Sequence, residues 1–232
     1  MKLEKITNVE SPQRRHYDDA CGTAHALDLV GERWALLVMR ELIFGPKRFS
    51  DLRAGLPGIS ANVLTQRLEG LEESGIVLRR KLPPPAAAQV YELTEWGYES
   101  EPIFRVLGRW AARSPSHDPT LPFGSASLLL SLRTMLDPAR AEGFAARVGF
   151  HMGAETFVAR LAEGRIDIAA GPLDKPDVTF TGAAAIIAAA IYGGQSLASL
   201  EANGALRVDG DHALAERFVT LFPLPEKVRL PA

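Results

Sequence analysis

Hydrophobic residues recur at helical spacing near the start of the chain. From residue 25 to residue 44 they fall every third or fourth position, with charged residues between them, and Gly45-Pro46 ends the pattern. This spacing predicts one amphipathic helix that buries a single apolar stripe.

The next two apolar patterns are joined by a tight turn. A short pattern at residues 50–56 stops at Pro57-Gly58, and a longer one runs from Ser60 to Gly75. Ser60 is a suitable N-cap, and leucines at positions 64, 68 and 71 mark the buried side of the longer helix. The pair is predicted to form a helix-turn-helix.

After Gly75 the period changes from helical to extended. Residues 76–81 and 89–93 are β-prone and flank a proline-rich connection, which predicts a hairpin. Helices followed by a two-stranded hairpin indicate a winged helix. A further helix is predicted after Thr94, with an apolar stripe of Ile103, Leu107 and Trp110 that could pack against a partner.

Three prolines and no periodicity mark residues 114–124, where we place a domain boundary. Beyond it, short segments alternate apolar and polar residues with period two, which predicts an antiparallel sheet with one buried face. The expected fold class is α+β. We expect a winged-helix domain at residues 1–115, a linker at 116–124 and a second α+β domain at 125–232.

Composition excludes little, but charge is unevenly placed. The 232 residues carry a formal charge of −2, whereas residues 40–81 hold eight basic and five acidic side chains. The longest apolar run, residues 182–194, is shorter than the ~20 residues of a membrane span. The start of the chain lacks the apolar run of a signal peptide, so a cytoplasmic location is expected.

Polar residues at the front of the helix after Ser60 are candidates for reading base edges. Amides and hydroxyls suit major-groove contacts, and Lys/Arg side chains on either side suit phosphate. The alternative is an ordinary solvated face. The candidate DNA contacts are Lys47, Arg48, Ser60, Asn62, Thr65, Gln66, Arg67, Arg79, Arg80 and Lys81.

Cys21 is the one cysteine, so a disulfide within the chain and a multi-cysteine metal site are excluded. Nearby cationic residues would favour its thiolate and a redox-sensing role; a small apolar residue at a helix start is the alternative. Scattered histidines and the absence of nucleophile or phosphate-loop motifs argue against an enzyme, and no cofactor or metal is expected.

Residues 14–113 resemble HxlR-type winged-helix regulators. The resemblance is carried by Cys21 upstream of "GERWALLVMRELIFGPKRFSDL", then by "PGISANVLTQRLEGLEESGIVLRR", "YELTEWG" and a closing helix with Trp110. It implies a bacterial transcription regulator that forms a homodimer through its terminal helices and binds double-stranded operator DNA. Some members sense oxidants or electrophiles through the upstream cysteine. The "PPPAAA" wing differs from the polar wing common in the family.

Residues 123–225 resemble sterol-carrier-protein-like domains through "GRIDIAAG", "KPDVTFTG" and "IYGGQSLASLEANGALRVDGD". The resemblance implies an apolar cavity for a hydrophobic small molecule. Periodicity alone leaves open whether the apolar residues line a cavity or fill a core. The candidate cavity residues are Phe150, Phe157, Ile168, Phe180, Ile187 and Ile191.

The hypothesis from the sequence is therefore a dimeric DNA-binding transcription regulator, modulated by a hydrophobic effector in its second domain. The alternative is a lipid or small-molecule carrier in which the winged helix serves dimerisation only. An enzyme ranks third.

Overall fold

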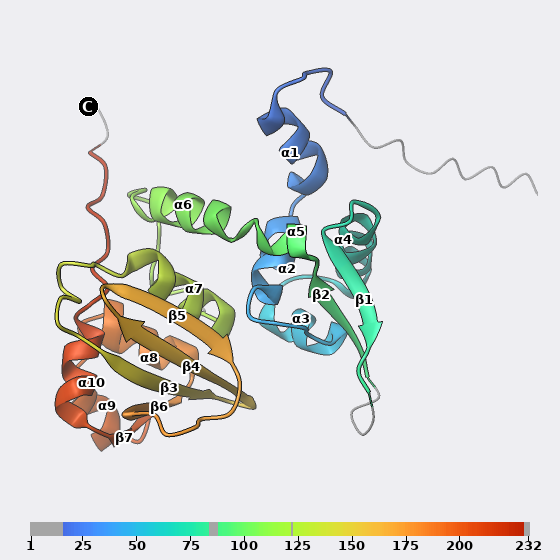
Figure 1. The fold of residues 1–232 in the computed structure, drawn as a ribbon. Coiled ribbons are helices and arrows are strands. Elements are labelled where there is room, and N and C mark those ends of the chain that lie inside the picture. Colours follow the sequence, from blue (N-terminus) through green and yellow to red (C-terminus); the bar gives the residue numbers. More distant parts are fainter. Residues whose placement is uncertain (1–15, 84–87, 122, 230–232) are drawn as a thin grey trace, which may run out of the picture.

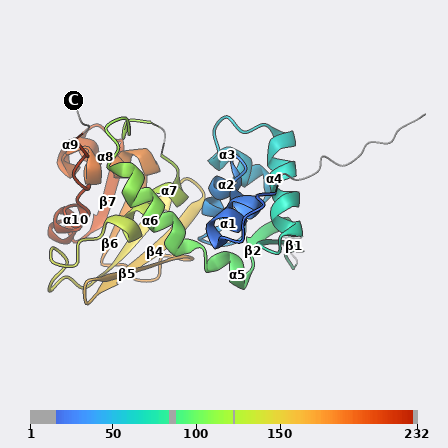
Figure 2. The same cartoon turned by 90° about the horizontal axis from the view of Figure 1, so that it is seen from above.

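The structure, a computed structural model, describes residues 16–83, 88–121 and 123–229. A winged helix and a sheet-containing part lie side by side, and one helix, α6, runs from the first across the top of the second (Figure 1). The view from above shows the same two parts (Figure 2).

The first predicted helix is in fact two helices. α1 ends at Gly31, and Trp34 then adopts a left-handed backbone with φ of 80° before α2 starts. A Cβ at Gly31 would lie 2.4 Å from the carbonyl oxygen of Leu27, so the glycine permits the tight end of α1. The break lets the partly buried Trp34 pack on the core of the winged helix. The two helices are α1 (Gly22–Val30) and α2 (Ala35–Leu42).

The remaining elements of the winged helix follow the predicted order, except that the single helix predicted after Thr94 is two helices, α5 and α6. Pro57 and Gly58, at φ of 90°, form the turn between α3 and α4. Thr94 caps α5 by accepting a hydrogen bond from the Gly97 N–H at 3.0 Å, as expected. The two strands are antiparallel, and Val77 pairs with Leu93. The elements are α3 (Phe49–Gly55), α4 (Ala61–Glu73), β1 (Val77–Lys81), β2 (Gln89–Leu93), α5 (Glu95–Tyr98) and α6 (Glu101–Ala112).

The second part is built on a five-stranded sheet of order β5-β4-β3-β6-β7. Three of its pairings are antiparallel as expected, but β3 and β6 are parallel, with Val148 opposite Val178. The sheet is therefore mixed, because the chain returns to β3 after the β4-β5 hairpin. The strands are β3 (Ala146–Met152), β4 (Glu155–Ala162), β5 (Arg165–Ala170), β6 (Val178–Gly182) and β7 (Leu206–Gly210).

Helices cover one face of this sheet (Figure 1). α7 is buried on most of its surface because it lies between the sheet and helices α2 and α6. Phe218 of α10 packs on Phe150 and Phe180, with ring centroids 6.0 and 5.6 Å away. The helices are α7 (Ser125–Met135), α8 (Ala184–Tyr192), α9 (Leu197–Ala202) and α10 (His212–Val219).

The two parts share one continuous hydrophobic core. Phe44, after α2, meets Phe157 of β4 edge to face at 6.1 Å. Polar contacts surround this ring pair and link both parts. We call this contact region the junction, formed by Phe44, Lys47, Glu101, Arg133, Glu155 and Phe157. The proposed domain limits stay a prediction, but the junction makes the two parts one packed unit.

Candidate nucleic-acid interface

α4 presents a polar front to solvent. Ser60 caps the helix by accepting a hydrogen bond from the Val63 N–H at 3.3 Å, as its sequence position predicted. Leu64, Leu68 and Leu71 are buried, while Asn62, Thr65 and Gln66 are exposed. The three exposed side chains follow from helical periodicity, because each lies off the leucine stripe.

The wing places three basic residues beside α4. Figures 1 and 2 both show α4 and β1 on the side of the winged helix away from the sheet. Arg79, Arg80 and Lys81 are exposed on β1. Arg79 lies 3.7 Å from Glu72 and Arg80 pairs with Glu92, whereas Lys81 has no ion pair among the described residues. The proline-rich tip at residues 84–87 lies outside the described residues.

Lys47 and Arg48 were predicted as equivalent phosphate contacts, but their environments differ. The Lys47 ammonium lies 3.2 Å from Glu41 and 3.1 Å from Glu155, and its side chain is 13% exposed. Burial lowers the pKa of Lys47, but Glu41 and then Glu155 outweigh burial, and the net pKa is raised. Arg48 is exposed. Lys47 therefore belongs to the junction, and Arg48 remains a candidate for DNA contact.

Arg67 lies between these two extremes. Its guanidinium is 3.3 Å from Glu32, and its Nε is buried without a hydrogen-bond partner among the described residues. We therefore leave Arg67 out of the group of exposed candidates. We call that group the recognition surface, and it consists of Arg48, Ser60, Asn62, Thr65, Gln66, Arg79, Arg80 and Lys81.

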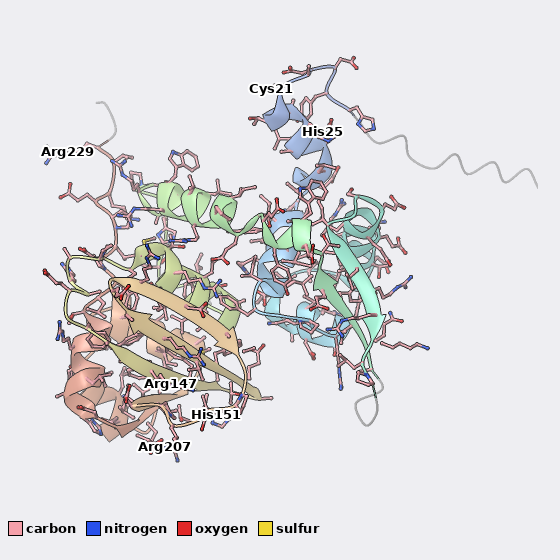
Figure 3. The ribbon with its side chains drawn as sticks, viewed as in Figure 1. Cys21, His25, Arg147, His151, Arg207 and Arg229 are labelled. Atoms are coloured by element: carbon pink, nitrogen blue, oxygen red, sulfur yellow. The ribbon has the colours of Figure 1, made fainter. Side chains whose placement is uncertain are left out.

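Cys21 lies at the start of α1, and its side chain is exposed (Figure 3). No capping hydrogen bond of standard geometry reaches its sulfur. The backbone N–H groups of Thr23 and then Ala24 nevertheless lower the pKa of the Cys21 thiol. A lowered pKa increases the thiolate fraction, which is the reactive form. The sensing role stays a prediction.

The candidate cavity residues are core residues, and Ile191 alone of the six is only partly buried. Phe150 and Phe180 stack at 5.9 Å, and Phe218 closes against both. Phe157 instead contacts Phe44 at the junction. The sequence interpretation did not include Phe218, although its place in the apolar pattern of α10 was a usable signal. Phe157 is also the cross-strand partner of Phe150, and the cavity stays a prediction.

Sequence reasoning also missed the central role of Arg133 on α7. Its Nη1 donates to Glu101 of α6 at 2.6 Å, and its Nη2 donates to the carbonyl oxygen of Ile168 on β5. The guanidinium also lies over the Phe44 ring, 4.8 Å from its centroid. No local pattern announces these contacts, because the partners come from three distant segments.

No described helix is both long and apolar enough to cross a bilayer. No cluster of three or more His, Cys, Asp or Glu side chains suited to a metal ion occurs among the described residues.

Residues 29–118 match the HxlR-like helix-turn-helix family, and residues 128–223 match the SCP-2 sterol transfer family. The HTH-type transcriptional regulator YvaP of Bacillus subtilis (strain 168) is 37% identical over 86 residues, 37% of this chain and 80% of YvaP. The HTH-type transcriptional regulator YodB of the same organism is 38% identical over 86 residues, 37% of this chain and 77% of YodB.

Among solved structures, the reduced form of YodB from B. subtilis aligns at 35% identity with a TM-score of 0.38. The alignment covers 42% of this chain and 98% of that chain. The recognition surface lies within residues 29–118, the range that matches the HxlR-like helix-turn-helix family. The chain belongs to the HxlR-like helix-turn-helix family and is a DNA-binding transcription regulator whose second part is related to the SCP-2 sterol transfer family.

Proposed function

We propose that the protein binds a specific operator as a homodimer, with α4 in the major groove. The observation that carries this proposal is the polar front of α4, where Asn62, Thr65 and Gln66 are exposed together. Asn and Gln amides can bond two groups on one adenine edge, and a Thr methyl can contact thymine. Exposed basic residues on the same side supply phosphate contacts.

Dimerisation is supported by the outer face of α6. Val106 and Trp110 are each 72% exposed, and Ile103 and Leu107 lie on the same face. The opposite face of α6 buries Phe104 and Ala112. Four adjacent large apolar side chains on one exposed helix face form a patch that a second copy can cover. A dimer would present two α4 helices to half-sites about 34–36 Å apart.

The first test measures binding to DNA from upstream of the protein's own gene, with random DNA as competitor. We expect Asn62→Ala plus Gln66→Ala to lose about tenfold or more in affinity for the specific site, because each lost base contact costs about 1–3 kcal/mol. Random-DNA affinity should change little. Gln195→Ala, on another exposed glutamine far along the chain, is the matched control. Unchanged specific binding by the double variant would refute base reading by α4.

The second test measures mass in solution. Trp110→Glu should shift the protein from dimer to monomer, because a charge within the covered patch would be buried. Trp96→Glu, on a tryptophan that is 50% exposed on α5, should leave the dimer intact. A dimer that survives Trp110→Glu would place the interface elsewhere.

The hydrophobic effector remains a separate part of the proposal. A ligand among Phe150, Phe180 and Phe218 requires these rings to separate, since they are already in contact. The alternative, a lipid or small-molecule carrier, also requires these rings to separate. It gives the polar front of α4 no role. We therefore keep operator binding as the function that the geometry supports best.

A further inference from the structure

A pocket of about 580 Å³ opens between the two parts of the molecule. Glu101 and Arg105 of α6 form one wall. The other wall is the edge strand β5, with Arg165 and Asp167, and the floor is the end of α7 with Arg133. Binding sites for small molecules are commonly ~300–1,000 Å³ and favour domain interfaces. The size and the position of this pocket both fit a ligand site.

Arg133, at the floor of the pocket, is held in place by contacts within the protein. Arg133 is 14% exposed and is held by Glu101 and by the carbonyl oxygen of Ile168. Asp167 lies 3.7 Å from the same guanidinium, but its own side chain is 78% exposed. Both carboxylates of the pocket therefore face Arg133: Glu101 forms a short hydrogen bond with it, and Asp167 lies farther away.

The two walls contribute a positive charge that these carboxylates do not neutralise. Arg105 and Arg165 come from different parts of the molecule, and neither has an ion-pair partner within the described ranges. The lining thus holds three guanidinium groups and two carboxylates. One negative charge placed between Arg105 and Arg165 would balance the pocket.

The pocket is mainly polar, but three apolar side chains form one smaller part of its lining. Leu136 and Pro138 lie at the end of α7, and Ile166 lies on β5. Gly164, at φ of 70° in the β4-β5 turn, keeps the turn tight against Pro138, since a Cβ there would come within 3.3 Å of that ring. An inorganic anion would leave this apolar surface uncovered.

We propose that this pocket binds a small organic monocarboxylate, with the carboxylate between Arg105 and Arg165 and the apolar body against Leu136, Pro138 and Ile166. Arginine pairs with carboxylates through two parallel hydrogen bonds, so either arginine offers a strong, directional contact. This site is separate from the aromatic core of the sheet, where the hydrophobic effector was predicted.

Such a ligand would connect α6 directly to β5. Because α6 also carries the proposed dimer face, the ligand would favour one placement of that face relative to the sheet. This consequence rests on the proposed function, and it requires different affinity for two placements. The binding step itself does not depend on DNA or on dimerisation.

The test uses the full chain without DNA, labelled with ¹⁵N and titrated with benzoate. We expect saturable shifts of backbone amides in the β4-β5 turn and at the end of α7, with a dissociation constant on the order of 1 mM. Benzamide, which has the same shape without the charge, and inorganic phosphate, which lacks the apolar body, should each bind at least about tenfold more weakly.

Arg105→Gln and Arg165→Gln should each weaken benzoate binding by about tenfold and leave the rest of the spectrum unchanged. Arg207→Gln is the matched control, because Arg207 is an exposed arginine on β7, at the opposite edge of the sheet (Figure 3). The proposal is overturned by benzamide or phosphate binding as tightly as benzoate, by equal weakening in the control, or by no saturable shift. These readouts stay valid if operator binding fails.

Discussion

The recognition surface and the junction both contain lysine and arginine, but in opposite environments. At the recognition surface Arg48 and Lys81 are exposed and have no ion pair among the described residues. At the junction Lys47 and Arg133 are 13% and 14% exposed and are held by carboxylates from both parts. An exposed cation is available to phosphate, whereas a buried one must be paired within the fold. Burial therefore decides which role each cation has.

The largest effect should follow from removing Arg133. Arg133→Ala leaves Glu101 without its partner and removes the cation over the Phe44 ring. We expect the free energy of unfolding, measured in urea, to fall by about 3 kcal/mol. Arg140→Ala is the control, because Arg140 is exposed and its loss should cost about 0.5 kcal/mol or less. If the free energy of unfolding fell equally in the two variants, the Arg133 contacts of the junction would stabilise the fold no more than an exposed ion pair does.

A sharper comparison uses the adjacent residues Lys47 and Arg48. Lys47→Met should lower the free energy of unfolding by about 2 kcal/mol and leave DNA affinity unchanged, because it removes a contact to Glu41 and Glu155. Arg48→Met should do the reverse. Its stability should change by less than about 0.5 kcal/mol, while DNA affinity falls about fivefold. A loss of DNA affinity in Lys47→Met would return that residue to the recognition surface.

The Lys47 contribution should also depend on pH in a defined direction. Its folded-state pKa is raised above 10.5, so the stabilisation is fully present below pH 10.5. It is lost as the pH rises through the raised folded-state pKa. The difference in stability between the wild type and Lys47→Met should therefore be constant from pH 7 to about 10 and shrink only above pH 10.5. A difference that shrinks near neutral pH would point to another group.

A smaller effect should separate two neighbours on β1. Arg80 pairs with Glu92, whereas Lys81 has no ion pair among the described residues. Lys81→Gln should therefore weaken DNA binding about threefold and reduce the salt dependence by about one released counterion, with Arg80→Gln having less effect. Titrations at several salt concentrations measure both quantities. The opposite order would show that the Arg80 ion pair opens on DNA.

The smallest effect concerns Cys21, which belongs to neither region. Because the Thr23 and Ala24 N–H groups lower the pKa of its thiol, alkylation by iodoacetamide should reach half its maximal rate at lower pH than in the urea-unfolded chain. The unfolded chain supplies the reference for the same thiol. Identical pH profiles would remove the basis for a sensing role.

Much of the winged helix could be predicted because its signals are local. Ser60, Thr94 and the leucines of α4 lie at positions fixed by helix caps and helical period. The break at Trp34 was not predicted, because the side chain of Trp34 packs on a core that the local pattern does not reveal. The ion pair of Lys47 with Glu155 was not predicted for a similar reason, since Glu155 lies more than a hundred residues away in sequence.

The sheet, too, could be predicted only in its local features. Period-two alternation located its strands, but it carries no information about which strands pair, so the parallel β3-β6 pairing was not predicted. The pocket beside α6 was equally invisible, because Arg105, Arg133 and Arg165 belong to three separate elements. In both cases the local sequence pattern does not show which distant segments come into contact.

The segment after α10 has a consequence for biosynthesis. Val228 donates its N–H to the carbonyl oxygen of Arg113 at 2.8 Å, and the Arg113 side chain donates to the carbonyl oxygen of Glu226. The residues joined by the second bond are 113 positions apart. At about 5–20 residues per second, a ribosome needs roughly 6–22 s to make the intervening chain. During that interval the end of α6 lacks these hydrogen-bond partners. A nascent winged helix can therefore begin to fold before the segment after α10 has been made.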